Sequence, residues 1–141
     1  MTEDAAEADA EVGLLDTSVF IARESGHAIA KLPDRVALSV ITIGELQLGV
    51  LNADNSVTRS RRADTLALAR AADPIPVSEA VMVSWARVIT DCRAAGVHRT
   101  VKLTDALIAA TAIEHGLPVV TQDADFDQIA RACPALSVIK V

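Results

Sequence analysis

Short apolar runs alternate with longer helical patterns along this chain, and this alternation limits the possible folds more than any other feature. Strands separated by helices are typical of a parallel sheet, because a parallel neighbour is reached only through a long crossover. The five runs are Val12–Leu15, Val36–Val40, Pro74–Val77, Pro118–Thr121 and Ser137–Val141. The pattern predicts an α/β fold with a central five-stranded parallel sheet covered by helices.

The segments between these runs contain recognisable helix boundaries. An N-cap side chain accepts a hydrogen bond from a free N–H group in the first turn of a helix. Candidate N-caps are Thr42, Ser56, Ser78 and Thr104. After Ser78, apolar side chains from Val81 to Cys92 recur at the 3.6-residue spacing of a helix, so we expect one face of that helix to be buried.

The bulk composition fits a single domain without structural metal or disulfides. The 141 residues are 51% hydrophobic but only 2% aromatic, so aliphatic side chains must fill the core. Cys92 and Cys133 lack the spacing of a zinc site or a disulfide framework. No apolar run approaches the ~18 residues of a membrane span, and the N-terminus lacks the basic residues of a signal peptide. We expect a cytoplasmic protein with an acidic flexible leader, residues 1–11, and one domain, residues 12–141.

The net charge of −6 is unfavourable for a nucleic-acid-binding protein until its position along the chain is considered. Residues 1–12 contain five acids and no base, which leaves 14 acids against 13 bases in the remainder. If four of those acids bind a metal ion, 10 acids and 13 bases remain outside the metal site. The metal-bound domain can then attract phosphate locally. The charge therefore permits RNA binding without requiring it.

Four carboxylates lie where apolar runs give way to helix starts. Asp16 and Asp123 follow the ends of the first and fourth predicted strands, and Glu45 and Asp105 lie near the starts of two predicted helices. The carboxyl ends of parallel strands meet at one edge of the sheet, where α/β proteins bind ligands. These positions predict that the four side chains converge on one site.

Each of these acids also has an ordinary structural explanation. Asp16 could cap the helix that follows it, and Glu45 could form a capping box with Thr42. The negative charge of Asp105 is favoured by the dipole at a helix N-terminus. Considered alone, each residue could have a structural or a functional role. Only the placement of all four together favours a shared functional site.

Three acids, Asp123, Asp125 and Asp127, follow the fourth strand at a spacing of two residues. They cannot all cap one helix, so at least one is free for another role. Asp123 is the preferred ligand because it lies nearest the strand end, and Asp125 is either an N-cap or an accessory group. Oxygen ligands without imidazole or thiolate suit Mg²⁺ or Mn²⁺, and a cation would relieve the repulsion among clustered carboxylates.

Four stretches of the sequence resemble, in order, those of PIN domains, and they are closest to VapC-type toxins. They are Leu14-Leu15-Asp16-Thr17-Ser18, Ile43-Gly44-Glu45-Leu46, Leu103 to Ala112, and Val120-Thr121-Gln122-Asp123-Ala124-Asp125-Phe126. The resemblance spans residues 12–141. It implies a three-layer α/β/α sandwich with strand order 3-2-1-4-5, in which strands one and four lie side by side. The acidic leader departs from the family pattern, because similar toxins begin almost directly with the first strand.

The resemblance also implies a function. It implies a Mg²⁺- or Mn²⁺-dependent endoribonuclease that cleaves single-stranded RNA, forms a homodimer, and acts as the toxin of a type II pair inhibited by a VapB-type antitoxin. The acids that it implies for catalysis and metal binding fall on Asp16, Glu45, Asp105 and Asp123. Hydroxyl groups near the site fall on Thr17 and Thr121, with Asp125 as an accessory acid. Activated water would attack the phosphodiester and leave a 5′-phosphate and a 3′-hydroxyl.

A basic stretch just before Asp105 is the candidate RNA contact. It consists of Arg93, His98, Arg99 and Lys102. Ordinary solvated charge explains this stretch equally well. Aromatic residues are too few to supply much base stacking, so we expect contacts to the RNA backbone and its shape.

Two other functions remain open. The first is a catalytically silent PIN-like module that binds metal and a protein partner. The second is a phosphate-transferring α/β hydrolase with a strand-end Asp, although Ser18 occupies the place of the second acid that such enzymes use. Cleavage of RNA, or release of phosphate from small esters, separates these possibilities.

Overall fold

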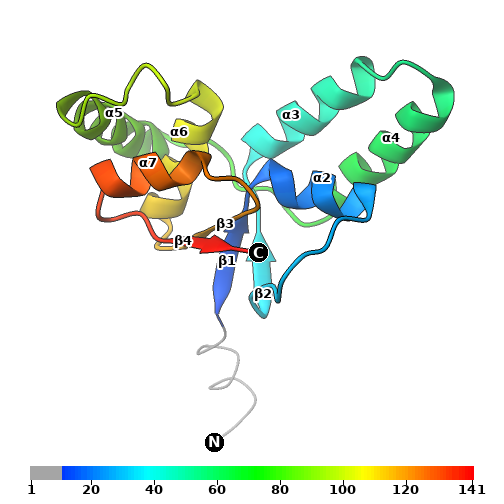
Figure 1. The fold of residues 1–141 in the computed structure, drawn as a ribbon, viewed down its shortest axis with the longest axis horizontal. Coiled ribbons are helices and arrows are strands. Elements are labelled where there is room, and N and C mark those ends of the chain that lie inside the picture. The colour runs from blue at the N-terminus through cyan, green and yellow to red at the C-terminus, as the bar shows by residue number, and fades with distance from the viewer. Residues whose placement is uncertain (1–10) are drawn as a thin grey trace, which may run out of the picture.

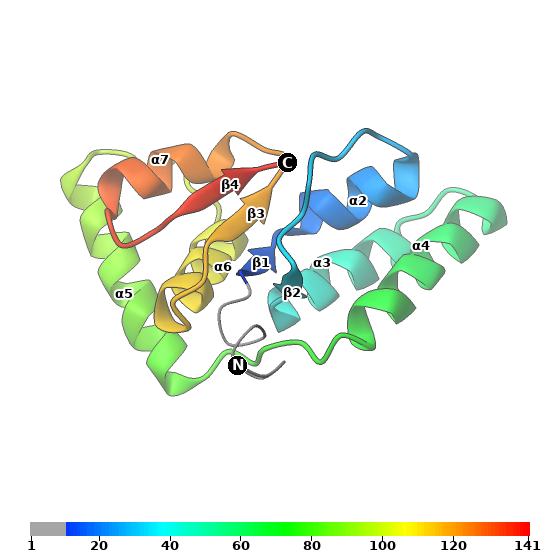
Figure 2. The same ribbon diagram turned by 90° about the horizontal axis from the view of Figure 1, so that it is seen from below.

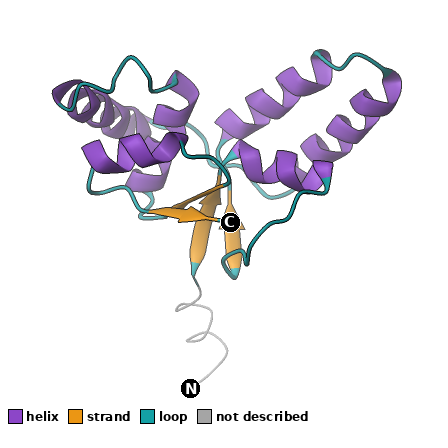
Figure 3. Ribbon diagram, viewed as in Figure 1, coloured by secondary structure: helices purple, strands orange, loops and turns teal. Residues whose placement is uncertain are grey.

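The computed structural model describes residues 11–141, and its centre is a parallel sheet of four strands (Figures 1 and 3). The strands are β1 (Val12–Leu15), β2 (Arg35–Ala37), β3 (Val119–Thr121) and β4 (Val138–Lys140). Their order is β2-β1-β3-β4, so the first and third strands along the chain are neighbours. The α/β class and the parallel sheet agree with the prediction from the sequence.

The prediction of five strands is wrong for residues 11–141, where the sheet has four. Pro74–Val77 forms no strand, although Ile75 makes one parallel bridge to Ser39 beside β2. Ile75 accepts a hydrogen bond from Val40 N and donates one to Leu38 O. Its neighbours Pro74 and Pro76 have no N–H group, so the pairing cannot extend into a ladder.

Within residues 11–141, six helices cover the two faces of the sheet. They are α2 (Thr17–Ser25), α3 (Val40–Leu51), α4 (Ser56–Arg70), α5 (Glu79–Ala94), α6 (Leu103–Glu114) and α7 (Asp125–Ala132). Helices α2, α3 and α4 lie on one side, and α5, α6 and α7 lie on the other (Figure 1). The view from below shows α3 beside α4 and α5 beside α6 (Figure 2). No helix within residues 11–141 is long and apolar enough to cross a membrane.

Alternating residues of the strands divide the core into two parts. Leu14 and Val119 pack into a cluster with α5, α6 and α7, whereas Leu15 and Val120 pack into a cluster with α2, α3 and α4. Successive side chains of a strand point to opposite faces, so a sheet buried on both faces needs continuous apolar runs. This requirement explains why the two central strands, β1 and β3, are the most apolar and most buried. It places their carboxyl ends between two helical layers.

The helix starts differ from the predicted ones in three of four cases. Ser78 caps α5 as predicted. The other observed N-cap residues are Ser39 for α3, Asn55 for α4 and Lys102 for α6. Helix α3 therefore begins before Thr42, and Glu45 lies well inside it. The capping-box explanation of Glu45 is wrong, because that motif requires an acid three residues after the N-cap.

The predicted leader lies outside the described residues except for Glu11.

Candidate active site

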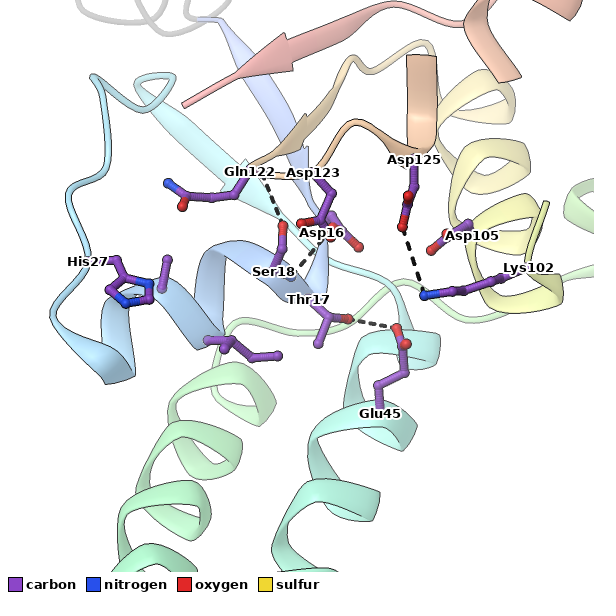
Figure 4. A pocket seen from close by; sticks show the side chains of 12 residues that line it. Asp16, Thr17, Ser18, His27, Glu45, Lys102, Asp105, Gln122, Asp123 and Asp125 are labelled. Atoms are coloured by element: carbon purple, nitrogen blue, oxygen red, sulfur yellow. Dashed lines mark hydrogen bonds and ion pairs between the residues drawn. The ribbon is translucent and has the colours of Figure 1, made fainter. Parts of the chain in front are cut away.

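The chain brings the four predicted acids to one pocket at the carboxyl edge of the sheet (Figure 4). Asp16 follows β1 directly, and Asp123 lies two residues beyond the end of β3, the strand beside β1. Glu45 reaches the pocket from α3 and Asp105 from the first turn of α6. Asp125, the first residue of α7, lines the same pocket. Five carboxylates from four separate parts of the chain therefore share one concave surface.

Asp16 is the most deeply buried of these acids, with 4% of its surface exposed. Its Oδ2 atom accepts a hydrogen bond from Thr121 Oγ1 at 3.0 Å and a longer one from Ser18 N at 3.4 Å. The second bond makes Asp16 the N-cap of α2. Capping and membership of the pocket are thus compatible, and the bond from a different strand fixes the carboxylate in the crevice.

A hydroxyl network connects the ends of β1 and β3. Ser18 Oγ lies 3.2 Å from Thr121 Oγ1 and accepts a hydrogen bond from Gln122 N at 3.0 Å. Thr121 Oγ1 also accepts a hydrogen bond from Asp123 N at 3.0 Å. Thr121 therefore holds the Asp16 carboxylate and the backbone of Asp123 in one arrangement.

Glu45 is held by a hydroxyl group from α2. Thr17 Oγ1 donates a hydrogen bond to Glu45 Oε1 at 2.7 Å and lies 3.1 Å from Thr42 Oγ1. Burial raises the pKa of Glu45, the Thr17 bond opposes this change, and the charge of Asp16 adds to it. The short contact fixes the direction of a carboxylate that lies among apolar neighbours.

The pKa values of Asp105 and Asp123 are raised as well. Burial, followed by the charges of Asp16 and Asp125, raises the pKa of Asp105 to about 6. The same causes in the same order raise the pKa of Asp123. A helix dipole favours the charged form of an acid in its first turn, so the net upward shift of Asp105 means that burial and crowding outweigh the dipole.

The donor set fits a hard divalent cation. The pocket offers carboxylate oxygens, and the raised pKa values show that negative charge there lacks compensation. Within residues 11–141, no three His, Cys, Asp or Glu side chains stand close enough together to hold one ion as they lie. Mutual repulsion among carboxylates favours such separation, and binding one ion requires them to move closer together.

The structure separates the predicted RNA-binding residues. Lys102 lines the pocket and pairs with Asp125, whereas Arg93, His98 and Arg99 are exposed and lie outside the pocket lining. Asp127 also lies outside the pocket, where it pairs with Lys140 at 2.9 Å.

Sequence reasoning missed three polar residues that line the pocket, namely Ser18, His27 and Gln122. Two of them adjoin predicted site residues, since Ser18 lies two positions after Asp16 and Gln122 lies between Thr121 and Asp123. Proximity to the strand ends was the available signal for these two. His27 follows the end of α2 and is exposed, and no pattern in the sequence separates it from a surface residue.

The family model of the PIN domain matches residues 13–132 of the chain. This chain belongs to the PIN-domain family. Ribonuclease VapC8 of Mycobacterium tuberculosis is 80% identical over 106 residues, which are 75% of this chain and 95% of that protein. Ribonuclease VapC5 of the same species is 41% identical over 131 residues, which are 92% of this chain and 95% of that protein. The resemblance to VapC-type PIN domains is confirmed.

A solved structure supports the same conclusion at the level of the fold. The VapBC-5 toxin–antitoxin structure from Mycobacterium tuberculosis matches with a TM-score of 0.81 and 38% identity. The match covers 92% of this chain and 98% of that one.

Proposed function

We propose that this PIN-domain protein is an endoribonuclease that requires Mg²⁺ or Mn²⁺ and serves as the toxin of a VapBC-type pair. The supporting observation is the position of four acids. Asp16, Glu45, Asp105 and Asp123 come from four separate segments and line one pocket. The relatives named ribonucleases support the choice of RNA as substrate.

The four acids are proposed as the ligands of the cation. Bound Mg²⁺ or Mn²⁺ supplies an activated water and stabilises the negative charge that develops on the phosphoryl group. The chain's own contribution is to hold Asp16 through Thr121 and Glu45 through Thr17 before the substrate arrives. Preorganised ligands lower the cost of reaching the reactive arrangement.

Asp105 and Asp123 are proposed to complete the ligand set, and Asp105 must be deprotonated to do so. The raised pKa of Asp105, about 6, means that part of its population is protonated in weakly acidic solution. Cation binding requires the deprotonated form, so it should become weaker as the pH falls through this range. Asp125 is proposed as an accessory acid at the pocket rim.

The proposed partner is a small VapB-type antitoxin. The structural relatives include toxin–antitoxin complexes named VapBC, and the chain covers nearly the whole toxin in the VapBC-5 match. We further propose that the chain forms a homodimer. Co-expression with the antitoxin-like product of a neighbouring reading frame should yield a complex that does not cleave RNA. A complex that cleaves RNA as fast as the isolated protein would count against the pairing.

Cleavage of single-stranded RNA is the direct test. Purified protein is incubated with RNA and Mg²⁺ or Mn²⁺, with and without a chelator, and the termini of the fragments are analysed. Asp16→Asn should lower the cleavage rate by about 10²–10³-fold or more, because it removes a buried ligand from the pocket. Chelation should abolish cleavage, and the products should carry 5′-phosphates.

The matched control is Asp127→Asn, which removes an acid outside the pocket lining. This variant should cleave like the unmodified protein. Equal cleavage by Asp16→Asn would contradict the assigned site. Binding without cleavage across varied RNAs and both cations would favour a silent binding module, and phosphate release from small esters would favour a phosphate-transferring hydrolase.

A further inference from the structure

The carboxylate pocket contains one strongly basic side chain. Among the lining residues within the described part of the chain, Lys102 is the one lysine or arginine beside five carboxylates. Lys102 immediately precedes α6, three positions before Asp105. Its Nζ atom lies 3.8 Å from Asp125 Oδ2, and Figure 4 shows it reaching toward that side of the pocket.

The charge of Lys102 acts on more than its nearest partner. Lys102 lines the same pocket as the carboxylates of Glu45, Asp105 and Asp123. These three carboxylates come from α3, from α6 and from the segment between β3 and α7. Its positive charge therefore acts on carboxylates from several elements of the fold.

The ion pair between Lys102 and Asp125 is loose. Its distance of 3.8 Å is long for an ion pair, and the two side chains are 72% and 49% exposed. Exposed pairs of this kind contribute little to stability, because water competes for both charges. Lys102 can therefore change partner at a small cost. Lys140 and Asp127 form a shorter pair of 2.9 Å outside the pocket lining.

We propose that Lys102 binds a phosphate of single-stranded RNA beside the carboxylate pocket, and that in the absence of RNA and cation it balances the charge of the carboxylates. The proposal rests on the proposed ribonuclease function. A phosphodiester that approaches five carboxylates is repelled, and a divalent cation removes part of this repulsion. The same cation replaces Lys102 as counter-ion, which leaves the ammonium group free for the phosphate.

Two binding measurements on Lys102→Met test this exchange, because methionine keeps an unbranched apolar side chain without the charge. Mn²⁺ binding is measured by calorimetry without RNA. RNA binding is measured by fluorescence anisotropy with Ca²⁺ in place of Mg²⁺, and the RNA is checked for integrity on a gel. The dissociation constant for Mn²⁺ should fall about threefold, since a competing positive charge is removed. The dissociation constant for RNA should rise about five- to tenfold, with a salt slope shallower by about 0.7.

The predicted changes in Mn²⁺ affinity and in RNA affinity have opposite directions, which distinguishes the proposed role of Lys102 from a structural role. Lys102→Arg should retain both affinities, and the matched control Lys31→Met, at an exposed lysine outside the pocket lining, should change neither. Unchanged RNA affinity in Lys102→Met would overturn the phosphate contact, and unchanged Mn²⁺ affinity would overturn the counter-ion role. Weakening of both affinities would show a structural role and overturn the proposal. If the unmodified protein binds no RNA with any cation, the ribonuclease function and the phosphate contact both fail, whereas tighter Mn²⁺ binding by Lys102→Met would still support the counter-ion role.

Discussion

The carboxylate pocket has two unlike walls. The fixed wall consists of Asp16 and Glu45, whose oxygens accept hydrogen bonds from the hydroxyl groups of Thr121 and Thr17. The open wall consists of Asp105 and Asp123, and no such bond to their carboxylates occurs from residues 11–141. Two of the four acids are therefore oriented by folding alone, and two are left for a ligand to orient.

The difference follows from where the residues lie. Asp16 adjoins the sheet and Glu45 faces α2, and both neighbourhoods carry buried threonines. Asp105 lies in the first turn of α6 and Asp123 lies in the segment after β3. Asp105 is buried without a hydrogen bond to its carboxylate, so burial and the neighbouring charges favour its protonated form. The ionised carboxylates of the open wall are therefore unfavourable without a counter-charge, and a bound cation would stabilise them.

The largest effect on cleavage is expected from Thr121→Val, which removes the hydroxyl group that holds Asp16 in the fixed wall. The variant leaves the Asp16 carboxylate buried without its closest hydrogen bond. Loss of a group that orients a metal ligand should lower the metal-dependent cleavage rate about 10- to 100-fold. The measurement is the rate of RNA cleavage at saturating Mg²⁺.

Thr121→Ser is the control for this change, because serine keeps the hydroxyl group and removes only a methyl group. It should retain most of the cleavage rate. A Thr121→Val variant that cleaves like the unmodified protein would show that the fixed wall needs no hydrogen bond to work.

A smaller effect is expected from a substitution in the open wall, Asp105→Asn, which should stabilise the metal-free protein. The folded-state pKa of Asp105 is about 6, above its ordinary value of 3.8. Its contribution to stability is therefore present below about pH 4 and is lost as the pH rises through 6. Asp105→Asn removes this loss, so at pH 7 the metal-free variant should be more stable by about 1–2 kcal/mol.

Chemical denaturation of metal-free protein between pH 4 and pH 7 checks this expectation. The advantage of Asp105→Asn should shrink toward pH 4 and should reverse at saturating Mg²⁺, because only the unmodified protein gains full binding energy. A variant that is less stable at pH 7 without metal would mean that the Asp105 carboxylate is already compensated.

The smallest effect is expected from Gln122→Ala, in the segment that carries Asp123. Gln122 Nε2 donates hydrogen bonds to Ala28 O at 3.1 Å and to Val141 O at 2.8 Å. Their loss should lower the free energy of unfolding by about 1 kcal/mol. Cleavage should change less than threefold, because in the proposed site the cation, and not Gln122, orients the Asp123 carboxylate.

The matched control is Gln128→Ala, whose Nε2 atom donates to Thr100 O at 3.2 Å outside the pocket. It should change stability slightly and leave cleavage unaffected. If Gln122→Ala slowed cleavage as much as Thr121→Val, the two walls would not differ in the proposed way.

The strand-end acids could be predicted from the sequence because the geometry of a parallel sheet leaves few alternatives. Once Val12–Leu15 and Val119–Thr121 are neighbours, Asp16 and Asp123 must emerge at the same edge. The place of Glu45 followed only from joint reasoning with the other acids. Its local sequence favours a capping box equally, and that explanation fails because α3 begins after Ser39.

The remaining features depend on contacts between distant parts of the chain. No local pattern reveals that Thr17 bonds to Glu45 or that Ser18 bonds to Gln122. Pro74–Val77 is apolar enough for a strand, and only the backbone pairing shows that it stops at a single bridge. The basic residues before Asp105 lie within one short segment, residues 93–102, yet only Lys102 of them lines the pocket.

Equilibrium binding of Mn²⁺ tests most directly whether the four acids share one cation site. Calorimetry is performed on the unmodified protein, on Asp16→Asn, Glu45→Gln, Asp105→Asn and Asp123→Asn, and on the control Asp127→Asn. Each of the four pocket variants should raise the dissociation constant about tenfold or more, and the control should not change it. A pocket variant that binds Mn²⁺ as tightly as the unmodified protein would contradict the shared site.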